Sequence, residues 1–241
     1  MVNNFEVNGR VRKIVERTYK KFLEYVKQHV DPNIEKKAKF FILGSYSTEK
    51  IPLEEGFSPK EILLKVKNSL LKELGKEEVF PFLMDDIKYF EFKVGEGEDL
   101  AVKFYVLSLF SDAVFLIIEA EKKVVVEGRK MLFPERHGPS IEWGMILPLA
   151  IASKMSIFIR EGVKHSEMYE KTKGVRKLLG IKEYRFKNVE ELLKQLITIA
   201  KKVVKKKFKN VEKTEIKKEK KKRRTVGFYR DELGRIRKIE K

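Results

Sequence analysis

The sequence alternates between short, continuous apolar runs and longer stretches whose apolar residues recur every three or four positions. The runs lie at residues 38–43, 114–118 and 155–159 and are rich in β-branched and aromatic residues. Such runs are typical of strands that are buried on both faces of a sheet, whereas the three- and four-residue spacing is typical of amphipathic helices. The pattern therefore predicts an α/β fold built on a parallel sheet.

Local signals define two of the expected helices in the first half of the chain. Residues 5–30 have helical spacing, and the helix should end at Asp31-Pro32-Asn33, because proline disfavours helix in the residue before it. Ser58-Pro59-x-Glu61 predicts a helix start in which Ser58 is the N-cap and Glu61 completes a capping box. That helix should run to about Leu74, with Gly75 as its end. A further helix is expected over residues 100–110.

A strand, a helix and a second strand are predicted in the middle of the chain. Residues 140–153 are strongly apolar and predict a buried helix with a kink at Pro148. With the strands at 114–118 and 155–159, this helix forms a right-handed crossover between parallel strands. Ligands bind beyond the carboxyl ends of such strands, where loops lead into helices. Glu142, in the first helical turn, would lie at that edge.

The remaining segments continue the alternation of helices and strands. A short strand is predicted at residues 79–83, and residues 124–131 either add a strand or begin a helix. The later elements are a helix at 169–179, an edge strand at 181–186 and a last helix, capped by Asn188, that fades into residues 205–207. We divide the chain into an N-terminal helical extension (1–36), an α/β domain (37–204) and a basic, flexible tail (205–241).

The net charge of +18 is concentrated at the C-terminus. Residues 201–241 carry 19 lysines and arginines against 6 acidic residues, a net charge of +13, while the other 200 residues carry only +5. A strongly basic segment suggests a polyanionic partner such as nucleic acid or the ribosome. The stretch 209–224 should be disordered or form a lone polar helix.

Aromatic residues and arginines interleave at the end of this basic tail. Aromatic rings can stack on bases while arginines contact phosphates, so the segment is a candidate for nucleic-acid binding. The alternative is a solubilising tail with a small hairpin at residues 232–234. The candidate nucleic-acid-binding residues are Arg223, Arg224, Phe228, Tyr229, Arg230, Arg235 and Arg237.

Composition excludes several kinds of chemistry. The chain has no cysteine, and its three histidines lie far apart, so disulfides and thiolate chemistry are excluded and no metal site or cofactor is predicted. No apolar run is long enough for a membrane span, and the N-terminus lacks the apolar core of a signal peptide, so we expect a cytoplasmic protein. Abundant Lys and Glu with only two glutamines resemble the usage of hyperthermophiles.

Two short polar segments follow predicted strands and are candidates for ligand contact. Gly44-Ser45-Tyr46 follows the first strand, and its small and hydroxyl residues permit close approach of a ligand. A plain strand-to-loop turn is the alternative. Asp85 and Asp86 follow the strand at 79–83 and either act as acid/base or metal-binding groups, or cap a turn or a following helix.

The arrangement of these motifs resembles the nucleoside 2-deoxyribosyltransferases and the related deoxynucleotide N-hydrolases, with TIR domains as more distant relatives. The matching motifs are the first strand with Gly44-Ser45-Tyr46, the pair Asp112-Ala113 before a central strand, and Gly138-x-x-x-Glu142-Trp143-Gly144. The resemblance covers roughly residues 38–200. In this chain, a longer loop precedes Gly138, and Trp143 replaces a small aliphatic residue.

The resemblance implies a Rossmann-like, flavodoxin-like parallel sheet with helices on both faces, and a nucleoside or nucleotide ligand. It implies that Glu142 is the catalytic carboxylate at the N-glycosidic C1′. Asp112 is a candidate for protonating the leaving base, with Asp85 and Asp86 as alternatives. The substrate would contact Gly44, Ser45, Tyr46, Gly138 and Ser140. The alternative role for Glu142 is to cap its helix or to pair with Arg136 or Arg160.

Three hypotheses follow from these observations. The first is an N-glycosidase or deoxyribosyltransferase. The second is a non-catalytic protein that binds nucleic acid or the ribosome through its basic tail. The third is an interaction module whose apolar helix, residues 141–151, helps form a homodimer, as in many proteins of the family that the chain resembles.

Overall fold

The structure is a computed structural model of the 241-residue chain, in two compact units, Met1–Lys201 and Lys202–Lys241. The residues that it describes are 9–46, 48, 56–87, 90–94, 97–98, 100–118, 123–126, 129–132, 154–162, 173–224, 228–230 and 236–238.

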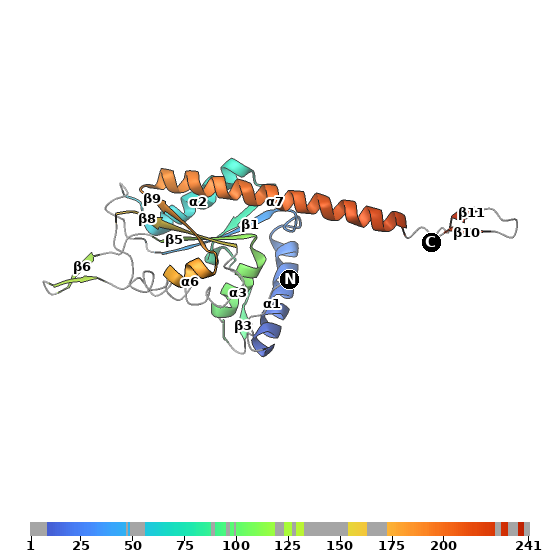
Figure 1. Ribbon diagram of the computed structural model, residues 1–241. Coiled ribbons are helices and arrows are strands. Elements are labelled where there is room, and N and C mark those ends of the chain that lie inside the picture. The colour runs from blue at the N-terminus through green and yellow to red at the C-terminus, as the bar shows by residue number, and fades with distance from the viewer. Residues whose placement is uncertain are drawn as a thin grey trace. The chain divides into compact units, whose positions relative to one another are not determined.

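A five-stranded parallel sheet forms the centre of the first unit, with the strand order β2-β1-β5-β8-β9 (Figure 1). In chain order this is 2-1-3-4-5, the order of flavodoxin-like folds, so the predicted fold class is confirmed. The three central strands are almost entirely buried, which explains their continuous apolar runs. The strands are β1 (Ala38–Gly44), β2 (Val79–Phe82), β5 (Ala113–Ile118), β8 (Met155–Arg160) and β9 (Lys182–Phe186).

Helices cover both faces of the sheet. On one face, α1 (Gly9–His29) packs against α3 (Leu100–Phe110), and their aromatic rings meet where Phe22 and Phe110 form an edge-to-face pair at 5.1 Å. On the other face lie α2 (Pro59–Leu74) and the first turns of α7 (Val189–Arg224) (Figure 1). The short helix α6 (Lys173–Leu178) precedes the last strand of the sheet.

Several predicted boundaries are confirmed. The helix expected at 100–110 has those bounds, and α2 begins with the predicted capping box and ends before Gly75. The question left open at residues 124–131 is settled by a hairpin of β6 (Lys123–Val126) and β7 (Arg129–Leu132). A second small hairpin joins β3 (Lys93–Val94) to β4 (Gly97–Glu98).

Other predictions require correction. The helix expected at 169–179 is described only as the six residues of α6, and the last helix does not fade at residues 205–207 but continues to Arg224. Lysine and arginine have good helix propensity, so a basic sequence does not by itself end a helix. The predicted helix at 140–153 lies outside the described residues.

The two outer strands of the sheet differ in sequence from the central strands, because β2 contains a proline and β9 is rich in charged residues. Pro81 lies in β2, paired in register with Phe40 of β1. In β9, Lys182, Glu183 and Arg185 are exposed, while Phe186 is buried. The prediction of an edge strand at residues 181–186 is confirmed.

The second unit consists of the continuation of α7 from Lys202 and a two-stranded antiparallel hairpin. The hairpin pairs β10 (Phe228–Arg230) with β11 (Ile236–Lys238), and Tyr229 lies opposite Arg237. Of the two structures predicted for residues 209–224, the chain therefore forms the helix, and the predicted hairpin follows it.

Candidate functional site

The strand order reverses beside β1, and this reversal defines the candidate site. The chain passes from β1 to its outer neighbour β2 and then crosses back to β5 on the other side of β1. In open α/β sheets, such a switch point leaves a crevice at the carboxyl ends of the two strands, and ligands bind there. Gly44 ends β1 at this edge, and Ser45 and Tyr46 follow it.

Gly44 lies where no side chain fits. A Cβ atom at this position would lie 2.9 Å from Cδ2 of Leu63 in α2 and 3.0 Å from the carbonyl oxygen of Ile117 in β5. Glycine therefore allows β1, β5 and α2 to pack closely at the carboxyl edge. The sequence predicted that glycine serves ligand approach, whereas the structure shows that it also serves the packing beneath the site.

Tyr46 is anchored to the end of the neighbouring strand. Its hydroxyl oxygen accepts a hydrogen bond from the backbone nitrogen of Met84 at 3.0 Å. Ser45 and Tyr46 are both partly buried. The loop after β1 is therefore tied to the turn after β2, which holds the aromatic ring of Tyr46 in a defined position at the carboxyl edge.

Asp86 caps that turn. Its carboxylate accepts hydrogen bonds from the backbone nitrogen of Leu83 at 2.7 Å and from Nζ of Lys67 at 2.8 Å. The turn is the short 3-10 helix η1 (Met84–Asp86), and Asp85 within it is exposed. Of the two roles predicted for this acidic pair, the structure shows the turn-capping role for Asp86.

Arg160 is the last residue of β8, one residue beyond the strand predicted at 155–159. It is only 1% exposed, and its guanidinium lies 4.9 Å from the ring centroid of Phe186. Its Nη1 donates a hydrogen bond to the carbonyl oxygen of Lys187 at 3.1 Å. These contacts tie β8 to the end of β9 and place a buried cation near the carboxyl edge. The sequence signal for this buried cation was the position of Arg160 directly after the apolar run at 155–159.

Asp112, the candidate for protonating the leaving base, lies at the amino ends of the strands, whereas Ser45 and Tyr46 lie beyond their carboxyl ends. It precedes β5, whereas Gly44 ends β1 and lies opposite Ile117 in the register of the two strands. Asp112 lies five residue steps along the chain from Ile117, or about 16 Å at the usual rise per residue of a strand. Asp112 therefore does not reach a ligand bound at the carboxyl edge.

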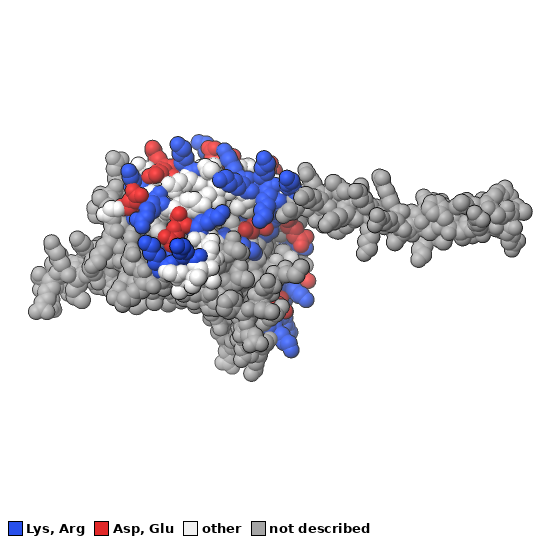
Figure 2. Space-filling model, viewed as in Figure 1, with Lys and Arg blue, Asp and Glu red and all other residues white. Residues whose placement is uncertain are grey.

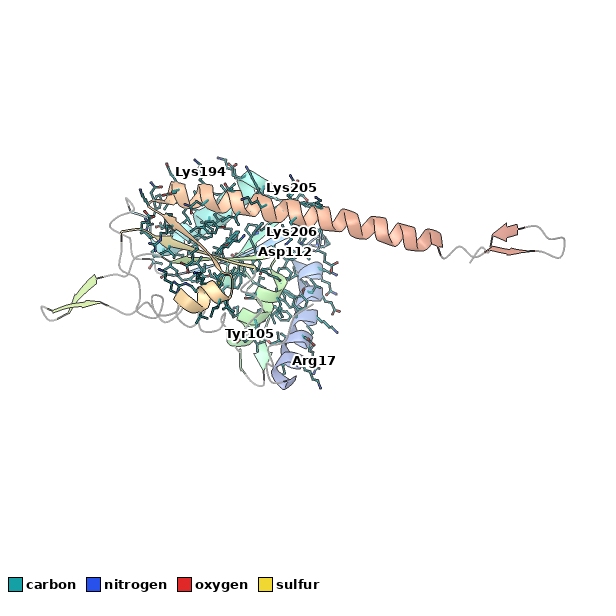
Figure 3. All side chains as sticks on the ribbon, in the orientation of Figure 1. Arg17, Tyr105, Asp112, Lys194, Lys205 and Lys206 are labelled. Carbon is teal, nitrogen blue, oxygen red and sulfur yellow. The ribbon has the colours of Figure 1, made fainter. Side chains whose placement is uncertain are left out.

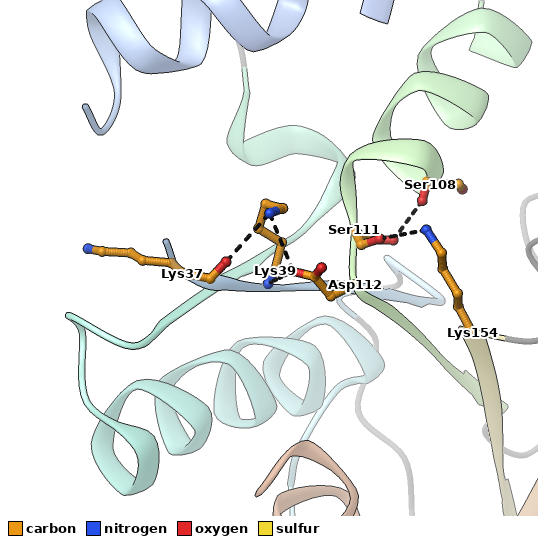
Figure 4. A network of polar contacts seen from close by, with 6 residues as sticks. All are labelled: Lys37, Lys39, Ser108, Ser111, Asp112 and Lys154. Atoms are coloured by element: carbon orange, nitrogen blue, oxygen red, sulfur yellow. Dashed lines mark hydrogen bonds and ion pairs between the residues drawn. The ribbon is translucent and has the colours of Figure 1, made fainter. Parts of the chain in front are cut away.

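The contacts of Asp112 are structural (Figure 4). Its carboxylate accepts a hydrogen bond from the backbone nitrogen of Lys39 at 2.8 Å and lies 3.3 Å from Nζ of the same residue. The backbone nitrogen of Asp112 in turn donates to the carbonyl oxygen of Lys39 at 2.8 Å. This reciprocal contact joins the beginnings of β1 and β5.

The same polar network extends along the amino edge (Figure 4). The hydroxyl of Ser111 donates to the carbonyl oxygen of Ser108 at 2.8 Å, and Nζ of Lys154 donates to the carbonyl oxygen of Ser111 at 3.1 Å. Burial raises the pKa of the Tyr19 hydroxyl, and the negative charge of Asp112 raises that pKa further. Tyr19 consequently keeps its proton at neutral pH.

The other predicted residues of the catalytic site lie outside the described residues. These are Gly138, Ser140 and Glu142, which lie between β7 and β8 in the sequence. The structure thus brings Gly44, Ser45 and Tyr46 together at the carboxyl edge, and the place of Glu142 beside them stays a prediction. Among the described residues, no group of three or more histidine, aspartate or glutamate side chains is arranged to hold a metal ion.

The predicted nucleic-acid-binding residues belong to the second unit. Arg223 and Arg224 are the last residues of α7. Phe228, Tyr229 and Arg230 form β10, and Arg237 lies in β11, while Arg235 falls outside the described residues. The hairpin thereby brings Arg237 opposite Tyr229, a pairing of basic and aromatic residues across two strands.

Comparisons with protein-family models, curated proteins and solved structures find no match to this chain. The class of protein is therefore defined by the strand order alone, as a flavodoxin-like α/β fold. In the part of the chain that the structure describes, no helix has the length and apolar character needed to cross a membrane.

Proposed function

We propose that the protein acts on the N-glycosidic bond of a nucleoside or nucleotide bound at the carboxyl edge of the sheet. The observation that carries this proposal is the reversal of strand order between β1 and β5, which coincides with the Gly44-Ser45-Tyr46 loop. A crevice at such a switch point suits a nucleotide, because the loops on its two sides can contact the base, sugar and phosphate separately.

The chemistry of Ser45 and Tyr46 supports a binding role for this loop in the proposal. The Ser45 hydroxyl can exchange hydrogen bonds with a sugar hydroxyl or a phosphate oxygen. The Tyr46 ring, fixed through its hydroxyl contact with Met84, offers an apolar face against which a base or sugar can pack. Gly44 keeps β1 close to β5 and α2, so this loop starts from a rigid strand end.

The proposed chemistry needs a carboxylate at the same edge, and Glu142 is the candidate. Breaking the bond between C1′ and the base nitrogen gives an oxocarbenium-like state, which an ionised carboxylate traps or stabilises. Water or a second base then takes the place of the departing base on C1′. A position in the first turn of a helix favours the ionised form of Glu142. Because Asp112 lies at the opposite edge, the leaving base takes its proton from another group or from water.

The test is release of free base from a pool of nucleosides, deoxynucleotides and NAD, followed by chromatography. The wild-type protein should release base from at least one member of the pool. Glu142→Gln is nearly isosteric, so it should fold normally while base release falls by about 10²-fold or more. Tyr46→Phe keeps the ring and serves as a milder variant, which should lower affinity for the substrate more than it lowers turnover.

Two results would contradict this proposal. Undiminished turnover in Glu142→Gln would remove Glu142 from the mechanism. Absence of base release from every member of the pool, with a wild-type protein shown to be folded by circular dichroism, would overturn the proposed reaction itself.

A further inference from the structure

Four lysines of α7 lie on one side of the helix within the second unit. Lys202, Lys205, Lys206 and Lys209 have the spacing i, i+3, i+4 and i+7, which places them on a common face. All four are exposed, while Val204 on the same stretch of helix is buried. Basic side chains gather on the visible surface over α7 (Figure 2), and Lys205 and Lys206 project from the helix (Figure 3). We call these four residues the α7 lysine face.

No acidic residue lies within the stretch of α7 that carries the lysine face, and the nearest acidic residues along the helix are Glu191 and Glu212. Within the described residues, none of the four lysines forms an ion pair, in contrast to Lys67 and Lys37, which pair with Asp86 and Asp31. Lysines at i and i+4 repel each other, so this helix gains stability when an anionic partner binds.

We propose that the α7 lysine face binds the phosphate backbone of a double-stranded nucleic acid, independently of its sequence. A lysine ammonium is a compact point charge that suits phosphate oxygens and carries no geometry for reading bases. An α-helix presents such charges about 5–6 Å apart along a straight face, which matches a continuous polyanion. The second unit as a whole has 18 lysines and arginines against 6 acidic residues, a net charge of +12 that attracts nucleic acid over a longer range.

The composition of the face favours a duplex over the two other polyanionic partners. Single-stranded nucleic acid is bound mainly by stacking of bases on aromatic rings, and the one aromatic residue between Lys202 and Lys209, Phe208, is partly buried. A helix that binds lipid needs a broad apolar side that is open to the membrane. Among the four lysines, Val204 is buried and Val203 and Phe208 are partly buried, and residues 212–224 contain a single apolar residue, Ile216. This inference does not rest on the proposed glycosidic activity, because it concerns a different unit of the chain.

The experiment measures binding of the full-length protein to short fluorescent duplexes of DNA and of RNA over a range of salt concentrations. The test variant replaces Lys202, Lys205, Lys206 and Lys209 by glutamine, which keeps helix propensity and removes four charges. Its affinity should fall by about 10²- to 10³-fold near 0.1 M salt, and the slope of log affinity against log salt should decrease in magnitude by about 3 to 4.

A control variant removes four positive charges from the first unit instead of from α7. Lys60, Lys72, Lys76 and Lys182 are exposed lysines of the first unit, and their replacement by glutamine should change the salt slope by less than one. Equal losses in both quadruple variants would overturn the proposal, since general charge would then explain binding. Circular dichroism of each variant establishes that α7 is retained.

Two further arms distinguish the other partners. Phe228→Ala with Tyr229→Ala removes the aromatic residues of the hairpin, and duplex binding should survive this change. If the hairpin variant loses duplex binding while the lysine variant keeps it, the proposed location is wrong. If the lysine variant loses binding to vesicles of anionic lipid and not to duplexes, the proposed partner is wrong.

Discussion

At the scale of single residues, Asp112 holds the beginnings of two central strands together. Its carboxylate contacts both the backbone nitrogen and the ammonium group of Lys39, and its negative charge raises the pKa of the Tyr19 hydroxyl, which burial already raises. The sequence could identify Asp112 as a polar residue before a buried strand. It could not identify the partner, which lies 73 positions earlier in the chain. Without the partner, a structural carboxylate and a catalytic one look the same.

We expect Asp112→Ala to destabilise the protein. The backbone nitrogen of Lys39 loses its side-chain acceptor in a partly buried place, and such a loss costs about 1–3 kcal/mol of unfolding free energy. Urea unfolding followed by circular dichroism measures this change. Asp112→Asn keeps an acceptor oxygen and should lose less stability than Asp112→Ala; equal losses in the two variants would show that the hydrogen bond is not the main contribution.

At the scale of elements, helix boundaries were predictable where the signal was local. Ser58 and Glu61 are three residues apart, and each bonds the backbone of the other, at 3.3 Å and 2.6 Å. The sequence contains everything needed for this arrangement, and α2 begins as predicted. The end of α7 was missed because its lysines suggested a solvated tail, while nothing in the sequence breaks the helix before Arg224.

Removal of the cap at the start of α2 provides a test at this scale. Ser58→Ala removes the oxygen that accepts from the backbone nitrogen of Glu61, so the unfolding free energy should fall by about 1 kcal/mol. Ser58→Thr keeps the hydroxyl and should retain most of that stability. Thermal unfolding of the three proteins side by side measures the difference, and a threonine variant as unstable as the alanine variant would contradict the capping role.

At the scale of the whole molecule, the apolar runs predicted the class of sheet, but they could not give its strand order. Continuous burial indicates parallel strands, whereas the position of β5 beside β1 depends on contacts between distant segments. The strand order then decides the site, because it puts Gly44 at a switch point and Asp112 at the other edge. Composition and periodicity alone did not contain the flavodoxin-like arrangement, which we expected only from the order of the sequence motifs.

The arrangement of the sheet predicts how its strands exchange hydrogen with solvent. The backbone amides of β5 and β8, which are buried throughout and paired on both sides, should exchange most slowly. Those of β9, with a single paired neighbour and three exposed residues, should exchange faster. Hydrogen exchange followed by mass spectrometry of peptides resolves these segments. Slower exchange in β9 than in β5 would contradict the description of β9 as the sheet edge.

The composition of the two outer strands restricts how copies of the protein can assemble. Pro81 has no backbone N–H to offer to an added strand at β2, and charged side chains occupy most of β9. Natural proteins use proline and charge at such positions to prevent sheets of separate molecules from joining edge to edge. A homodimer of this chain, which the sequence suggested, should therefore form through its helices and loops. The five-stranded sheet should not continue from one subunit into the other.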